Sequence, residues 1–149
     1  MSDWSRDAGR RLQEVREARL TQQKIVLRNA DLLKNHGPDQ WSRLATLFKQ
    51  KATDLNAESG LSGTLVFNEP RFEEFSITTR ENSGTIRGKF VPEAYTIQIQ
   101  NSQYELKTVH LKLFPDANES SVYLGDENGT PIDLDSFVIA HLESLLGIR

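Results

Sequence analysis

The sequence predicts an α+β fold: an N-terminal helical hairpin, an antiparallel meander sheet of five to six strands, and a C-terminal helix packed on one sheet face. Three observations support this class. Apolar residues recur at helical spacing up to residue 60. From Leu61 onward, apolar and polar residues alternate in short runs that turn residues separate. Residues 133–149 return to a helical pattern.

The length and composition indicate one domain over residues 1–149, with the hairpin at 1–60, the sheet at 61–132 and the last helix at 133–149. The absence of cysteine excludes disulfide scaffolds, cysteine–zinc sites and thiol nucleophiles. No apolar run is long enough to span a bilayer. We therefore expect a cytoplasmic protein without a membrane contact.

The first helix is predicted over residues 3–35, where Gly9 is the only helix-breaking residue. A helix of that length measures about 48 Å, whereas a compact domain of this size is only about 38 Å across. The helix must therefore overhang the domain or break at Gly9. Residues 5–19 carry few apolar side chains and residues 25–33 carry many, so we expect the second stretch to anchor the helix.

The second helix of the hairpin is predicted to begin at Pro38, which is favoured at a first helical position. Gly60 follows its end as a C-terminal cap. The short connection over residues 35–38 predicts that the two helices run antiparallel. The second helix carries one apolar stripe at helical spacing, composed of Trp41, Leu44, Ala45, Phe48, Ala52 and Leu55.

The sheet is predicted from short runs rich in β-branched and aromatic residues. Their connections are too short for crossover helices, so neighbouring strands are expected to pair antiparallel. The alternation predicts one buried face and one solvated face. The candidate strands cover residues 64–68, 72–80, 85–91, 95–101, 104–114 and 121–124.

The sequence predicts no catalytic residue, no metal site and no cofactor. The three histidines lack the spacing of a metal site, and no phosphate loop or nucleophile motif occurs. Asp126 begins an acidic stretch, but a calcium loop starting there would need a glutamate where Phe137 stands. The absence of these motifs argues against an enzyme but does not exclude one. No pattern in the sequence resembles a known family.

Charge is distributed unevenly. Up to Gly60 there are 11 Lys and Arg against 8 Asp and Glu, and beyond it there are 7 against 13. Guanidinium groups favour carboxylate and phosphate partners, so the arginine-rich first helix is the predicted interaction surface. The alternative is that these arginines belong to an ordinary solvent-exposed helix face and form ion pairs with acidic residues of the same helix. The surface consists of Arg6, Arg10, Arg11, Leu12, Val15, Arg16 and Arg19.

The first helix only partly fits a coiled-coil seam. Arg19, Gln22 and Asn29 occupy seam positions between the apolar residues. The first helix is therefore not a leucine zipper, but its apolar spacing is consistent with a short antiparallel packing of two overhanging helices. Nucleic acid is the weaker hypothesis, because aromatic residues do not interleave with the arginines. The apolar residues near the seam are Leu12, Val15, Val26 and Leu33.

Two hypotheses of different classes follow. The first is a non-enzymatic interaction module, homodimeric or bound to an acidic protein, that uses the basic first helix. The alternative is a small-molecule-binding domain or enzyme with a cavity between the sheet and the helices. The polar groups expected to line such a cavity belong to Tyr95, Tyr104, Tyr123 and His141.

Overall fold

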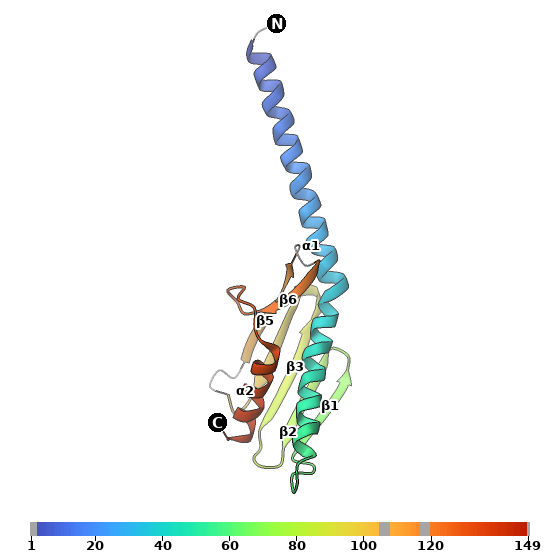
Figure 1. Cartoon of the computed structure of the whole chain (residues 1–149), viewed down its shortest axis with the longest axis vertical. Coiled ribbons are helices and arrows are strands. Elements are labelled where there is room, and N and C mark those ends of the chain that lie inside the picture. The colour runs from blue at the N-terminus through green and yellow to red at the C-terminus, as the bar shows by residue number, and fades with distance from the viewer. Residues whose placement is uncertain (1–2, 105–107, 117–119, 149) are drawn as a thin grey trace.

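The computed structural model, which describes residues 3–104, 108–116 and 120–148, contains a long helix, six strands and a second helix (Figure 1). This confirms the α+β class, the antiparallel sheet and the C-terminal helix. The elements are α1 (Asp3–Asn56), β1 (Leu65–Arg71), β2 (Glu74–Thr79), β3 (Thr85–Val91), the 3-10 turn η1 (Pro92–Ala94), β4 (Thr96–Asn101), β5 (Thr108–Asp116), β6 (Ser121–Gly125) and α2 (Leu134–Leu146).

The six strands form one sheet in the order β1-β2-β3-β4-β5-β6, and every neighbouring pair is antiparallel. The expected strand over residues 104–114 begins at Thr108, and its residues 105–107 lie outside the described part. Along β2, β3 and β4, every second residue points toward the helices and is buried beneath them, as Phe75, Ile86 and Ile99 are. Both helices cover this face (Figure 1). The alternate residues on the other face of β2, β3 and β4 are mainly polar, as the alternation predicts.

The predicted helical hairpin is wrong. α1 is one continuous helix of 54 residues that passes through both Gly9 and Pro38. A proline inside a helix removes one backbone hydrogen bond and costs about 3 kcal/mol, but packing around it offsets this cost. Gly37 is buried against β5, where an added Cβ would lie 3.3 Å from Leu113 Cδ1, and Trp41 follows one turn later at 1% exposure.

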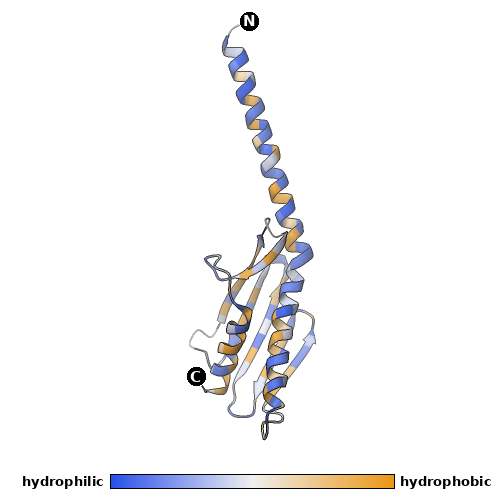
Figure 2. Ribbon diagram, viewed as in Figure 1, coloured by the Kyte–Doolittle hydropathy of each residue, from blue (hydrophilic) through white to orange (hydrophobic). Residues whose placement is uncertain are grey.

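The part of α1 that lies on the sheet, residues 32–56, is called the packed segment. It contributes the centre of the core, where Trp41 stacks on Phe75 at 5.5 Å between ring centroids and Phe48 meets Phe75 at 5.0 Å. The indole nitrogen of Trp41 donates a hydrogen bond to the Phe72 carbonyl oxygen. Figure 2 shows hydrophobic residues alternating with hydrophilic ones along α1 and a larger share of hydrophobic residues in α2.

Side-chain and backbone contacts tie α2 to the sheet beside the packed segment. The Asn82 amide donates to the Leu145 carbonyl oxygen at 3.0 Å, and the Ser144 hydroxyl donates to the Gln103 carbonyl oxygen at 2.9 Å. Gly147 ends α2 in a left-handed conformation, with φ +69°. We call the sheet, α2 and the packed segment together the body.

The remainder of α1, residues 3–31, is called the projecting segment, and it extends away from the body (Figure 1). At 1.5 Å per residue this segment is about 43 Å long. The expectation that residues 25–33 anchor the helix is only partly correct. Leu32 is buried, but Ile25, Val26 and Leu27 are 45%, 56% and 66% exposed because the sheet ends below them.

Candidate interaction surface

One face of the projecting segment carries a row of residues separated by steps of three or four, which we call the projecting row. Several of its apolar side chains are uncovered: Trp4 is 75%, Leu12 49%, Val15 44% and Val26 56% exposed. The row consists of Trp4, Ala8, Leu12, Val15, Arg19, Gln22, Val26 and Asn29, and Leu33, the next residue at this spacing, is half-buried against the core at the start of the packed segment.

The projecting row continues without interruption into the core. The same steps of three or four residues lead from Leu33 through Gly37, Trp41, Leu44, Phe48 and Ala52 to Leu55. From Leu32 onward this side of α1 lies against the sheet. The projecting row therefore occupies the side of α1 that the body covers lower down, and its apolar residues have no such cover.

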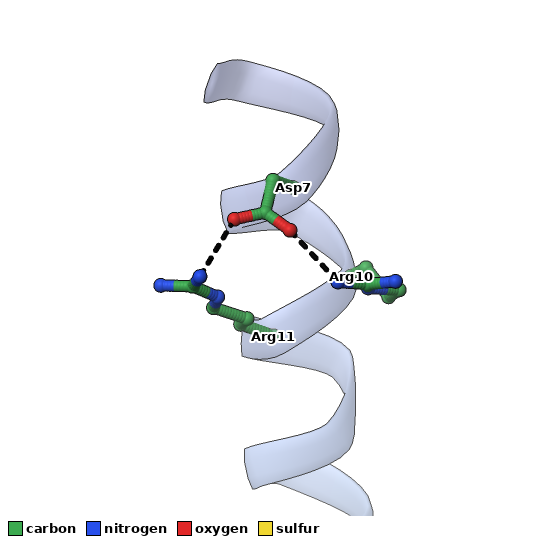
Figure 3. Close-up of polar contacts among 3 residues, drawn as sticks. All are labelled: Asp7, Arg10 and Arg11. Atoms are coloured by element: carbon green, nitrogen blue, oxygen red, sulfur yellow. Dashed lines mark hydrogen bonds and ion pairs between the residues drawn. The ribbon is translucent and has the colours of Figure 1, made fainter. Parts of the chain in front are cut away.

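The arginines of the predicted surface have two kinds of environment. The Asp7 carboxylate accepts contacts from Arg10 Nη2 at 2.8 Å and from Arg11 Nη2 at 3.0 Å, so one acidic group holds two guanidinium groups (Figure 3). All three side chains are exposed, so these pairs contribute at most about 1 kcal/mol each. Within the described chain, no salt bridge joins Arg6, Arg16 or Arg19 to another residue.

The base of the projecting segment meets the end of the sheet. Arg28 Nη2 donates to the Ser120 hydroxyl at 3.0 Å, which connects α1 to the start of β6. Asn29 is half-buried one position further along, and Leu32 is the first buried residue of α1. Contact between α1 and the sheet thus begins near residue 28.

Charge separates along the long axis of the molecule. The projecting segment, residues 3–31, contains seven Lys and Arg against five Asp and Glu, whereas residues 61–149 contain 7 against 13. The stretch between them, residues 32–60, contains four against three. A basic projecting segment therefore extends from an acidic body.

The residues predicted to line a cavity lie at different places. Tyr104 stacks on His141 at 4.4 Å between ring centroids. Tyr123 stacks on Phe114 at 5.3 Å and donates its hydroxyl to the Gly129 carbonyl oxygen. Tyr95 adopts a left-handed backbone conformation after η1 and packs against the core. The structure brings together Tyr104 and His141, but it does not bring Tyr95 and Tyr123 to them.

His141 is a buried histidine with defined partners. The Asn101 side-chain amide lies 3.1 Å from both the Nδ1 atom and the carbonyl oxygen of His141. An amide that donates to Nδ1 requires this nitrogen to be unprotonated. Burial disfavours the charged ring and lowers the pKa of His141 to about 4. The ring is thus a neutral part of the core near pH 7.

A hollow of about 730 Å³ lies between α1, β6 and the start of α2. Its lining is mixed, with Gln40 and Arg43 from α1, Tyr123 from β6, and Asp133 and Asp135 beside α2. Tyr123 is the one predicted cavity residue that reaches it among the described residues. A cavity between the sheet and the helices with Tyr123 in its lining was expected from the sequence, but its other walls were not identified, because they are far apart along the chain.

In residues 3–104, 108–116 and 120–148, no three His, Asp or Glu side chains lie close enough together to hold a metal ion. In the same part of the chain, no helix is sufficiently long and apolar to cross a bilayer.

Sequence reasoning placed Leu12 and Val15 on the interaction surface, named Val26 only as a residue near the seam, and omitted Trp4. Trp4 lies on the same face, and steps of four residues back from Leu12 would have identified it. What the sequence could not show is that the sheet leaves this face uncovered. Comparisons of the chain with protein families, curated proteins and solved structures returned no match.

Proposed function

We propose that this chain is a non-enzymatic protein–protein interaction module of the cytoplasm, in which the projecting segment docks onto another polypeptide. The supporting observation is a helix about 43 Å long that leaves the body with its apolar row exposed. Helices gain most of their stability from packing an apolar face. A partner on the projecting row would provide this packing, and the cysteine-free chain suits a reducing compartment.

Site-specific photo-crosslinking tests this function directly. A photoreactive amino acid is placed at Val15, on the projecting row, or at Leu20, which is 57% exposed and lies off the row. In cells that make the protein at its natural level, position 15 should give adducts of defined mass and position 20 should not. Absence of a specific adduct at position 15 would reject the proposed function.

The hollow between α1 and β6 favours a second candidate function, the binding of a small molecule. Its volume of about 730 Å³ lies within the range of small-molecule sites, and its lining contains charged groups of both signs, from Arg43, Asp133 and Asp135. A ligand that binds only the folded state raises the melting temperature. A metabolite screen should then give a hit that stabilises the wild type and loses its effect in Arg43→Ala; a screen without hits would count against this candidate.

A further inference from the structure

We propose that the projecting segment binds a second copy of this chain in antiparallel orientation, so that each copy's N-terminal tip lies beside the other copy's body. The proposal rests on the proposed function of the projecting segment as a docking element. It adds the identity of the partner and the direction in which the partner helix runs. Three properties of the described residues support it: the side on which the projecting row lies, the distribution of charge, and the spacing of apolar residues.

The position of the row decides between the two helix directions. The projecting row and the covered side of the packed segment are the same side of α1, so a helix bound to the row points toward the end of the sheet. An antiparallel partner brings the first turn of its own α1, which starts at Asp3, to this end of the sheet. A parallel partner would bring its own sheet and α2 to the same place, where the two bodies would compete for space.

Charge favours the same direction. The projecting segment is basic, and residues 61–149 carry 7 Lys and Arg against 13 Asp and Glu. In an antiparallel pair, each basic tip approaches an acidic body, and the two bodies lie at opposite ends of the helix pair. A parallel pair would place both acidic bodies at one end and both basic tips at the other, where like charges repel.

The spacing of apolar residues suits an overlap centred near residues 17 and 18. Ala8 of each copy then lies beside Val26 of the other, and Trp4 lies next to the half-buried Leu33, where the other copy's body begins. Leu12 lies closer to the centre of the pair, and the apolar row of each copy covers that of the other. The polar members of the row, which make it a poor leucine zipper, limit the affinity without preventing contact.

The association is tested on the purified full chain by sedimentation over a wide concentration range. The wild type should approach twice the monomer mass of 16.9 kDa. The double variant Leu12→Ser and Val15→Ser removes apolar side chains from the row and should raise the dissociation constant roughly 100-fold or more. Leu20→Ser with Leu27→Ser removes apolar side chains that are more exposed than Leu12 and Val15 but lie on another face, and this variant should leave the constant unchanged.

The direction of the helices is tested by distances between spin labels. The sequence has no cysteine, so Ala8→Cys and Ala18→Cys each provide a unique labelling site. In the antiparallel pair, labels at position 8 should lie about 30 Å apart, and labels at position 18 only about 10 Å. In a parallel pair both distances would be short, and that result would overturn the proposal.

The outcomes separate this proposal from the proposed function. A chain that stays monomeric at every concentration overturns the second copy as partner. If crosslinks at position 15 then contain a different polypeptide, the docking function stands with a heterologous partner. If the chain dimerises but the Leu20 and Leu27 control weakens it as much as the row variant does, the projecting row is not the interface and the proposal fails.

Discussion

The two segments of α1 share one continuous row of residues but have opposite surroundings. In the packed segment the row carries Trp41, Leu44 and Phe48, all at most 1% exposed beneath the sheet. In the projecting segment it carries smaller or polar residues such as Ala8 and Gln22, and solvent reaches them. Helix formation is common to both segments, so the position of the sheet determines which part of the row becomes core.

The largest expected difference comes from removing one ring in the packed segment. Phe48 is fully buried and lies against Phe75, so Phe48→Ala should lower the free energy of unfolding by about 3–5 kcal/mol. Leu27→Ala, at a residue 66% exposed in the projecting segment, should change it by less than about 0.5 kcal/mol. Urea denaturation measures both, and comparable losses would contradict the distinction between the segments.

A second expected difference is sensitivity to acid, because the body contains a buried histidine and the projecting segment contains none. The pKa of His141 is about 4 in the folded chain and 6.5 without burial, so the unfolded chain takes up the proton first. This pKa difference adds to the free energy of unfolding. Its contribution is fully present above pH 6.5 and is lost as the pH drops toward 4, by about 3 kcal/mol in total.

Urea denaturation at several pH values, together with an NMR titration of the His141 ring, checks this dependence. His110 is exposed on β5, so His110→Gln should leave the profile unchanged. If the His141 ring instead titrates near pH 6.5 in the folded protein, burial does not lower its pKa and the predicted loss of stability in acid is wrong.

A smaller effect is expected at Gly9. No atom lies within 4 Å of where a Cβ would stand, so Gly9→Ala introduces no clash. Alanine favours a helix over glycine by up to about 1 kcal/mol, and the variant should stabilise the helix around residue 9. Hydrogen exchange of the neighbouring amides measures this gain; unchanged protection would mean that the first turns are already stabilised by a contact outside the chain.

The smallest effect on the body is expected from removing residues 1–19. Contacts between α1 and the sheet begin near residue 28, so the shortened chain should unfold within about 0.5 kcal/mol of the full chain at concentrations where it is monomeric. A clear loss of cooperativity in urea would show that the projecting segment supports the body.

Much of the architecture could be predicted because it depends on local patterns. Alternation identified the strands, and helical spacing identified the stripe from Trp41 to Leu55. The hairpin was predicted incorrectly because Gly37 and Pro38 locally favour a break. In the structure the helix continues through both residues, and Gly37 lies against Leu113 of β5, a contact that is distant in the sequence.

The candidate surface was only partly predictable for the same reason. The basic and apolar residues of the first helix are visible in the sequence, but their exposure depends on where the sheet ends. The expectation that residues 25–33 anchor the helix failed on Ile25 and Val26. Their apolar character does not reveal whether a strand or solvent faces them. Likewise, the sequence could not show that Tyr95 and Tyr123 lie at different places, because their positions depend on how β4, β5 and β6 pair in the sheet.

The two tryptophans divide the molecule into independently observable parts. Trp4 is 75% exposed near the tip of α1, and Trp41 is 1% exposed at the centre of the core. A water-soluble quencher should therefore reach the indole of Trp4 and leave that of Trp41 shielded until the body unfolds. The unlabelled protein thus carries two intrinsic fluorescence probes: shielding of the accessible one reports docking at the tip, and a change in the shielded one reports loss of the core.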